Sequence, residues 1–396
     1  MRILIVSEVF YPENFIVNDL AEEWKSMGHD VEVLTPYPSY PYSYVFDGYV
    51  NKGYCVEEWN GIKIHRFPFV EGYKDSLKKK FSNYVSFVRD GRRLIKKIGY
   101  NFDCIFVSQT GPLTVALPAL VARKKYGTPV AIWTQDIWPN AVFSYGIPSN
   151  VITNFFLDRL IRYIYKRCDT IFVSSKRFED TIRKYVNKDC VYTPNWLKPT
   201  TETKSSLRLD KSKYHFTFTG NVSRYQNLIN TIRGFSLAKL KNCVLNIIGD
   251  GSYLEYVKSV VKAEGIENVI FYGRYPYSEM NDILCQSDTL VLPLIPDEGI
   301  MQTEPFKLQS YLNARKPILG ILGGSGQEII SDYKLGVCAN TNDVQDIARA
   351  FQEAKEFSML HAEEVKVASE NLMQTRFSKD VIVKTFTETL KGRLRK

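Results

Sequence analysis

Metal-ligand and disulfide signals are scarce in this chain. Its 396 residues include only four histidines and seven cysteines. The cysteines are scattered and form no C-x-x-C pair, no two histidines have metal-ligand spacing, and no D-x-D triplet occurs. We therefore expect buried, reduced thiols and no dedicated catalytic metal.

Long apolar runs are also missing. The first residues, MRILIVSEVF, form a short strand-like run that lacks the basic region and long apolar core of a signal peptide. No apolar stretch reaches the roughly 18 residues that a transmembrane helix needs. We expect a cytoplasmic protein, or one attached to the inner surface of the membrane.

The composition is otherwise that of a globular protein, with 44% hydrophobic and 24% charged residues. The formal net charge of +9 favours anionic partners but does not indicate a fold. Nucleic acid, nucleotide phosphates and anionic lipid are all compatible with it.

Short apolar runs alternate with helical patterns along most of the chain. The runs predicted as strands are residues 3–7, 31–35, 62–67, 104–108, 129–133, 170–174, 215–219, 244–248, 269–272, 289–293 and 317–321. This alternation, with continuous apolar strands, is typical of doubly wound parallel sheets in α/β proteins.

The alternation pauses once, in a polar and charged segment. We predict a Rossmann-like domain over residues 1–195, a linker over 196–212 and a second Rossmann-like domain over 213–375. The helical pattern of residues 376–396 has no following strand, and we expect it to pack back towards the first domain. Ligands of such sheets bind beyond the carboxyl ends of the strands, and two facing domains would enclose a cleft.

Two loops of the second domain have phosphate-binding patterns. In GNVSRYQN (220–227), backbone N–H groups and Arg224 can contact a diphosphate. An ordinary turn with a solvated arginine is the alternative. The glycines of Gly249-Asp250-Gly251 permit a close approach of the backbone, and a helix capped by Asp250 is the alternative.

Two further loops add to this pattern. The loop GRYP (273–276) offers its backbone to a base edge and Tyr275 for stacking. Segment 297–318 crosses Pro305 into a helix, where Glu304 can accept hydrogen bonds from sugar hydroxyls. Lys307 and the helix N-terminus can hold a phosphate. The alternative is a surface helix with an intrahelical Glu304–Lys307 pair.

Loops of the first domain also follow predicted strands. They are YPENF (11–15), YPSYP (37–41) and QDIWP (135–139). Asp136 could receive an acceptor hydroxyl or contact a donor sugar, or it could simply cap the turn. The aromatic loop 37–41 suits stacking on sugar rings, with a rigid connector as the alternative.

Residues 74–97 carry nine basic and two acidic side chains. The apolar residues that share one helical face are Leu77, Phe81, Tyr84, Val85 and Val88. The pattern is typical of an amphipathic helix that lies on anionic lipid, or of a core-packing helix with a solvated basic face. No nucleic-acid-binding motif accompanies it, so we expect no nucleic-acid partner.

These and other segments together resemble a known family. They are YPENFIVNDLAEEW (11–24), GHDVEVLTPYPSYP (28–41), GIKIHRFP (61–68), QDIWP (135–139), TPNW (193–196), TGNVSRYQNL (219–228), IIGDGSYLE (247–255) and FKLQSYLNARKPIL (306–319). The chain resembles the retaining glycosyltransferases of family 4, which have the GT-B fold. The match looks closest to the subgroup of L-fucosamine transferases and colanic acid glycosyltransferases.

The resemblance implies a metal-independent transfer from an NDP-sugar, in this subgroup a UDP-sugar, to an undecaprenyl-diphosphate-linked saccharide. The sugar would be a hexose or N-acetylhexosamine, and the product a surface polysaccharide such as O-antigen or capsule. The donor-side residues that it implies are Gly220, Asn221, Arg224, Gln226, Gly249, Asp250, Gly251, Arg274, Tyr275, Glu304, Lys307 and Ser310. On the acceptor side we expect Asn14, Tyr37, Asp136 and Trp138.

The chain departs from the commoner family pattern at several positions. Gln302 and Ser310 stand where a Glu-x7-Glu pair is usual. Asn221 and Gln226 replace an arginine and a lysine of the phosphate loop, and Gln135 replaces a histidine. We expect Arg224, Glu304 and Lys307 to compensate.

The resemblance implies that the anomeric configuration is retained. In same-face attack, a phosphate oxygen of the donor would take the acceptor proton, while Arg224, Lys307 and the helix N-terminus near residue 305 stabilise the leaving diphosphate. Asp136 would act on the acceptor side. Two alternatives stay open: a UDP-sugar epimerase of the same fold, and an inactive sugar-nucleotide-binding subunit, suggested by the missing carboxylates at 302 and 310.

Overall fold

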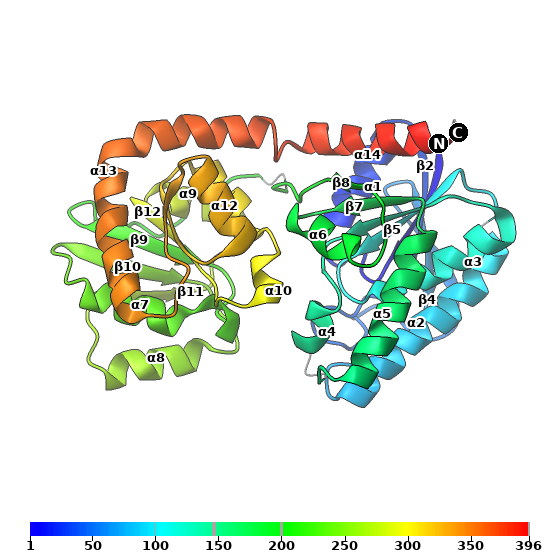
Figure 1. The fold of residues 1–396 in the computed structure, drawn as a ribbon, viewed down its shortest axis with the longest axis horizontal. Helices are drawn as coiled ribbons and strands as arrows, with labels where there is room; N and C mark the ends of the chain where they lie inside the picture. Colours follow the sequence, from blue (N-terminus) through cyan, green and yellow to red (C-terminus); the bar gives the residue numbers. More distant parts are fainter. Residues whose placement is uncertain (99, 145–147, 199–200, 395–396) are drawn as a thin grey trace. The chain divides into compact units, whose positions relative to one another are not determined.

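The computed structural model describes residues 1–98, 100–144, 148–198 and 201–394. Residues 199 and 200 of the predicted linker and 395 and 396 of the predicted C-terminal helix lie outside this range. The chain forms two compact units (Figure 1). Unit 1 comprises Met1–Asn195 and Asp380–Lys396, and unit 2 comprises Trp196–Lys379.

Unit 1 is built on an eight-stranded sheet with the order β3-β4-β2-β1-β5-β6-β7-β8. Its strands are β1 (Arg2–Ser7), β2 (Asp30–Pro36), β3 (Cys55–Trp59), β4 (Ile62–Phe67), β5 (Cys104–Gln109), β6 (Val130–Thr134), β7 (Thr170–Val173) and β8 (Cys190–Tyr192). Each neighbouring pair is parallel except β3 with β4. In the central strand, Ile5 lies opposite Val33 of β2 and Phe106 of β5.

Helices cover both faces of this sheet. They are α1 (Ile16–Ser26), α2 (Leu77–Ile98), η1 (Leu113–Ala116), α3 (Leu117–Tyr126), α4 (Asn140–Ser144), α5 (Val151–Arg167), α6 (Arg177–Arg183) and α14 (Lys379–Leu394). Residues of α2, α3, α5 and α6 share one buried apolar cluster with alternate strand residues, such as Ile105 and Val107 of β5. Alternate residues of a strand point to opposite faces, so Phe106 faces the other layer.

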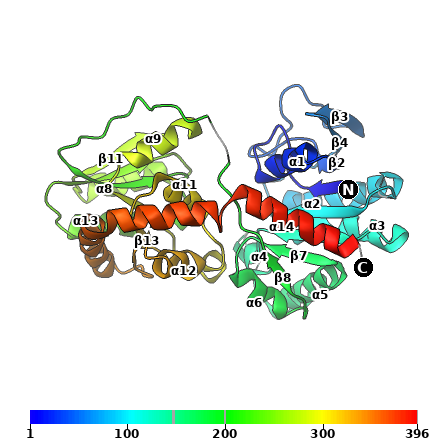
Figure 2. The same ribbon diagram turned by 90° about the horizontal axis from the view of Figure 1, so that it is seen from above.

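The C-terminal helix α14 lies in that other layer beside α1 (Figure 2). The ring centroid of Phe386 is 4.7 Å from that of Phe172 and 5.1 Å from that of Trp133. The indole N–H of Trp24 donates a hydrogen bond to the hydroxyl of Thr387 at 3.1 Å. The last helix is therefore part of the core of unit 1.

Unit 2 contains a six-stranded sheet with the order β11-β10-β9-β12-β13-β14. Its strands are β9 (Tyr214–Thr219), β10 (Cys243–Ile248), β11 (Val269–Gly273), β12 (Thr289–Pro293), β13 (Ile318–Ile321) and β14 (Gly336–Cys338). All of these pairs are parallel. The loops that follow the strands therefore meet at one edge of the sheet.

Two buried clusters cover the faces of this second sheet. The helical segments of the unit are η2 (Arg224–Gln226), α7 (Leu228–Leu237), α8 (Leu254–Ala263), η3 (Tyr277–Glu279), α9 (Met280–Cys285), α10 (Glu298–Met301), α11 (Lys307–Ala314), α12 (Gly324–Asp332) and α13 (Val344–Gln374). Helices α7 and α8 and the first half of α13 pack on one face, and α9, α11, α12 and the second half of α13 on the other.

The prediction of two parallel-sheet α/β domains is confirmed. Each predicted strand is present, with bounds shifted by at most two residues. The short strands β3, β8 and β14 were not predicted, and β3 is antiparallel to its neighbour. No helix in the described part of the chain has both the length and the hydropathy of a membrane span.

Candidate functional site

Glycines bring two loops of unit 2 into direct contact. The N–H of Val222 donates a hydrogen bond to the carbonyl of Asp250 at 2.8 Å. A Cβ atom at Gly249, whose φ is +148°, would lie 1.9 Å from the carbonyl oxygen of Gly220. One at Gly251 would lie 2.3 Å from the carbonyl oxygen of Val222. These loops pack this closely only because both positions lack a side chain.

A cavity of about 570 Å³ opens at this edge of the sheet. Its lining comes from the loops after β9, β10 and β11 and from the start of α11. The lining residues are Thr219, Gly220, Asn221, Ile248, Gly249, Asp250, Gly251, Arg274, Tyr275, Tyr277, Met280, Phe306, Lys307 and Ser310. Most of the residues predicted on the donor side therefore share one cavity, whose size is that of a small-molecule site.

Lys307 is the first residue of α11 and, like Arg274, a cation that lines this cavity. Its Nζ donates a hydrogen bond to Oε1 of Gln226 at 2.5 Å and lies 4.0 Å from the ring centroid of Phe218. Loss of hydration lowers the pKa of Lys307 to about 7. A phosphate bound here would restore the charged form, because it supplies the negative charge that the surroundings lack.

Gly220 sets the position of that ammonium. Its φ is +120°, and a Cβ atom there would lie 2.7 Å from Cε of Lys307. A side chain at this position would therefore displace the end of the lysine side chain. Gly220 and Lys307 are therefore coupled sterically, although they lie far apart in the sequence.

Glu304 has a different partner from those expected. It lies in the loop before α11 rather than in the helix, and its side chain is buried. Its Oε1 accepts a hydrogen bond from Nη2 of Arg376 at 2.9 Å. The intrahelical Glu304–Lys307 pair that we considered as an alternative is not formed in the structure, and Glu304 is not among the residues that line the cavity.

The remaining residues predicted on the donor side differ in whether they reach the cavity. Arg224 is exposed in η2 and does not line the cavity, whereas Gln226 reaches Lys307. Asp250 does not cap α8, because that helix begins at Leu254 and has no side-chain cap. Instead, Oδ1 of Asp250 accepts a hydrogen bond from the N–H of Gly251 at 2.7 Å.

In unit 1, Asp136 follows β6 in a largely dehydrated position. Burial raises its pKa to about 6. The amide of Gln109, at the end of β5, donates hydrogen bonds to the carbonyls of Gly111 at 2.7 Å and Asp136 at 2.8 Å. This amide fixes the two loops to each other.

Two further carboxylates at this edge were missed by the sequence analysis. Glu8 directly follows β1, and burial, then the charges of Glu13 and Asp136, raise its pKa to about 7. Glu13 is buried, and its carboxylate accepts hydrogen bonds from the backbone N–H groups of Phe10, Ser39 and Tyr40 at 3.1, 2.8 and 2.6 Å. Burial still raises the pKa of Glu13 despite these bonds.

The predicted acceptor residues lie in different surroundings. Asn14 is exposed, whereas Tyr37 is only 5% exposed and donates a hydrogen bond to the carbonyl of Lys52 at 3.3 Å. The aromatic ring that the 37–41 loop exposes is that of Tyr40, at 45%. Trp138 is buried and lines a second cavity together with α2.

Comparison with known families accounts for both units. A model of the glycosyl transferase 4-like domain matches residues 14–196, and a model of the glycosyl transferases group 1 matches residues 199–370. The chain is a two-domain glycosyltransferase. The resemblance noted from the sequence is confirmed at this level.

Relatives from bacteria agree with this assignment. The probable glycosyltransferase WbjE of Pseudomonas aeruginosa is 25% identical over 269 residues, which span 64% of this chain and 67% of WbjE. An uncharacterised 41.2 kDa protein in the cps region of Klebsiella pneumoniae is 26% identical over 189 residues. That match spans 46% of this chain and about half, 48%, of the relative.

Solved structures share the fold of the glycosyltransferase. Sucrose-phosphate synthase from Thermosynechococcus elongatus superposes with a TM-score of 0.75 at 13% identity and full coverage of both chains. Anabaena HepE, solved in complex with UDP, has a TM-score of 0.67 at 12% identity, with 99% of this chain and 100% of HepE covered. These neighbours are GT-B glycosyltransferases, so the predicted fold class is confirmed.

Proposed function

We propose that this glycosyltransferase moves a sugar from a UDP-sugar to a lipid-linked saccharide during the synthesis of a bacterial surface polysaccharide. The observation that carries the proposal is the cavity of unit 2, where loop backbones, Arg274, Lys307 and Ser310 converge. HepE, which shares the fold, was solved with UDP. A relative that lies in a cps region supports a role in O-antigen or capsule synthesis.

In this proposal the diphosphate lies against the backbone of Gly220 and Gly249 and against Lys307. The ammonium group gains a charge partner, so its proton is retained while negative charge builds on the leaving diphosphate. We keep a metal-free reaction as part of the proposal because a protein cation supplies this charge. Arg274 and Tyr275, which line the cavity, would contact the base, and Ser310 the ribose.

The proposed reaction retains the anomeric configuration, as in the L-fucosamine and colanic acid subgroup. The acceptor hydroxyl attacks the sugar from the face that the diphosphate leaves, and a donor phosphate oxygen takes its proton. Asp136 would orient the acceptor saccharide, with Asn14, Tyr37 and Trp138 in the surrounding loops. The transferred group would be a hexosyl or N-acetylhexosaminyl residue.

The acceptor we propose is an undecaprenyl-diphosphate-linked saccharide, which resides in a membrane. The enzyme would then work as a peripheral protein on the inner face of the cytoplasmic membrane. Helix α2, which contains most of the basic segment 74–97, would supply the contact with anionic lipid.

Donor and acceptor screening tests this function. UDP- and GDP-sugars are first compared by thermal stabilisation, and those that stabilise are assayed for transfer to lipid-linked saccharides, with product configuration read by NMR. We expect a UDP-sugar to bind and a retained linkage to form. Isomer formation from the donor alone would instead indicate an epimerase, and donor binding without any transfer would indicate an inactive partner subunit.

A further inference from the structure

Helix α2 has one broad apolar face, and the core covers only part of it. Phe87, Leu94 and Ile95 are buried in the main cluster of unit 1. In the first half of the helix, residues of the predicted apolar face stay uncovered: Phe81 is 67% exposed and Val85 is 51% exposed. An apolar face that the core leaves partly uncovered indicates a surface that binds another apolar partner.

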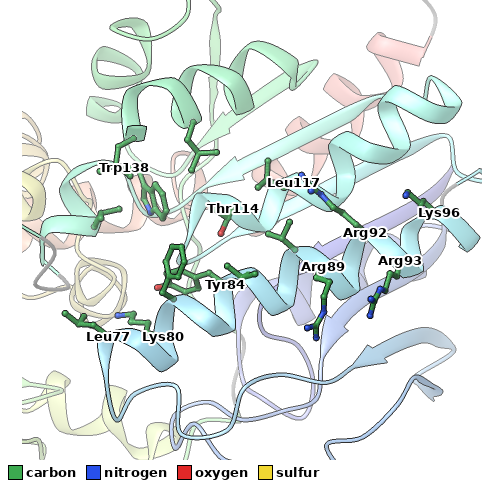
Figure 3. A pocket seen from close by; sticks show the side chains of 16 residues that line it. Leu77, Lys80, Tyr84, Arg89, Arg92, Arg93, Lys96, Thr114, Leu117 and Trp138 are labelled. Atoms are coloured by element: carbon green, nitrogen blue, oxygen red, sulfur yellow. The ribbon is translucent and has the colours of Figure 1, made fainter. Parts of the chain in front are cut away.

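The uncovered part of this face forms a groove with the helical segments η1, α3, α4 and α5. We call it the α2 groove, and its volume is about 660 Å³, within the range of small-molecule sites. Its lining residues are Leu77, Lys80, Phe81, Tyr84, Val85, Val88, Arg89, Arg92, Arg93, Lys96, Thr114, Leu117, Trp138, Val142, Leu157 and Leu160. Figure 3 shows Tyr84, Thr114, Leu117 and Trp138 around its apolar part.

Every charged residue that lines the α2 groove is basic. Arg89 and Arg93 share Asp90, with nitrogen–oxygen distances of 2.7 and 3.3 Å. No ion pair involves Arg92 or Lys96 within the described chain, and both are exposed near the end of α2 (Figure 3). An apolar channel beside unbalanced positive charge is complementary to a molecule with a long apolar chain and an anionic head.

The other end of the α2 groove reaches the candidate acceptor site. Trp138 lines the groove and stands two positions after Asp136 in the loop that follows β6. Lys80 lines it too, and its charge acts on Glu8, which also interacts with Asp136. A ligand in the groove would therefore place its polar end among these carboxylates.

Further apolar side chains are exposed at the start of α5, the helix that contributes Leu157 and Leu160 to the groove. Val151 is 86% exposed, and Phe156 is 66% exposed. Side chains of this kind lower their free energy by entering a lipid interface. Val151 and Phe156 therefore lie on the helix that forms one wall of the groove, as expected if the groove opens towards a membrane.

We propose that the α2 groove binds the apolar chain of the lipid-linked acceptor. The apolar chain would lie along the groove, with its diphosphate near Lys80 at the end that reaches the acceptor site and its saccharide directed to Asp136. This inference rests on the proposed function for the identity of the acceptor, but the groove itself is defined by unit 1 alone. A nucleic acid would use the positive charges and leave the apolar lining unoccupied.

Binding of farnesyl diphosphate by the full-length chain tests this proposal without any sugar transfer. Isothermal titration compares it with inorganic diphosphate, which has the charge but no chain. Val85→Glu places a carboxylate in the groove at a half-exposed position, so folding should persist. Val367→Glu makes the same change on α13, where the valine is 65% exposed, and serves as the matched control.

We expect the wild type and Val367→Glu to bind farnesyl diphosphate at least roughly tenfold more tightly than inorganic diphosphate, because the chain adds buried apolar area. Val85→Glu should lose that advantage while keeping its affinity for UDP. Equal affinity for the two diphosphates in the wild type, or an unchanged advantage in Val85→Glu, would overturn the proposal.

A second comparison separates this inference from the proposed function. Val85→Glu should lose transfer to a lipid-linked acceptor but keep transfer to the same saccharide on a short water-soluble aglycone. That result would show that the groove binds the lipid chain of the acceptor. If the wild type binds farnesyl diphosphate but transfers no sugar, the groove assignment stands and the proposed function is contradicted. Equal loss of both transfers in Val85→Glu would contradict the groove assignment.

Discussion

The Nζ of Lys307 donates a hydrogen bond to Oε1 of Gln226 at 2.5 Å, on the wall of the cavity in unit 2. The contact joins the loop after β9 to the first turn of α11. It holds a dehydrated ammonium at the start of α11, beside the loops after β9, β10 and β11 that line the cavity. We infer that this arrangement is built for an anion with several oxygen atoms, such as a diphosphate.

The affinity for UDP should depend on pH through Lys307. Burial lowers its pKa to about 7 in the free protein, so the binding-competent ammonium is lost as pH rises above that value. Bound phosphate would keep it protonated, and we expect affinity to fall roughly fivefold between pH 7 and pH 8. Titration in buffers of different ionisation enthalpy should also show proton uptake on binding.

The control for this pH effect is Lys307→Arg. A guanidinium stays charged across the same range, so the pH dependence should vanish even if the affinity itself changes. An identical pH profile in Lys307→Arg would assign the effect to another group.

Gly220→Ala should impair UDP binding more than folding. The new Cβ atom would meet Cε of Lys307 at 2.7 Å and displace the ammonium. Gly265→Ala is the matched control, because that glycine also has positive φ but no atom within 4 Å of an added Cβ. Both variants should lose about 1 kcal/mol of stability from backbone strain. Calorimetry and UDP titration should show that only Gly220→Ala also loses affinity.

The Glu304–Arg376 pair should contribute mainly to stability. Both side chains are poorly exposed, at 3% and 14%, so removing either one takes this partner away from a poorly hydrated charge. Glu304→Ala and Arg376→Ala should each lower the free energy of unfolding by about 3 kcal/mol. The double variant should lose less than the sum of the two. Full stability of Glu304→Ala with loss of transfer would favour its predicted role at the donor sugar.

Glu8→Gln should stabilise the protein at neutral and higher pH. Burial raises the pKa of Glu8 from 4.5 to about 7, so the folded state favours the protonated carboxyl. Its contribution is fully present below pH 4.5 and is lost as pH rises through 7. We expect Glu8→Gln to exceed the wild type by on the order of 2 kcal/mol at pH 8 and to match it near pH 4.5. Denaturant unfolding at both pH values measures the difference.

The parallel strands were predictable because burial on both faces makes them continuous apolar runs. The edge strand β3 was not, because Glu57 and Glu58 interrupt its apolar pattern. A buried side chain of the neighbouring strand β4 contacts β3. Glu57 accepts a hydrogen bond from Nε of Arg66 at 2.8 Å, and that arginine is fully buried.

The shared cavity of the predicted loops could be expected because Gly220, Gly249 and Arg274 directly follow strands at one edge of the sheet. Long-range partners could not be expected. Arg376 lies 72 positions after Glu304, and the backbone that binds Glu13 includes Ser39. Nothing local in the sequence marks Glu8, whose properties come from burial beside two other carboxylates. The sequence predicted an apolar face on α2, but only the folded structure shows that this face lines a groove.

Titration of UDP into the wild type, Lys307→Ala and Lys262→Ala tests the donor site most directly. Lys262 is an exposed lysine on α8 and controls for the loss of one positive charge. We predict saturable binding of UDP by the wild type and Lys262→Ala, and at least roughly tenfold weaker binding by Lys307→Ala. Equal UDP affinity in all three proteins, or no binding of UDP by the wild type, would contradict the assignment of this cavity to the donor.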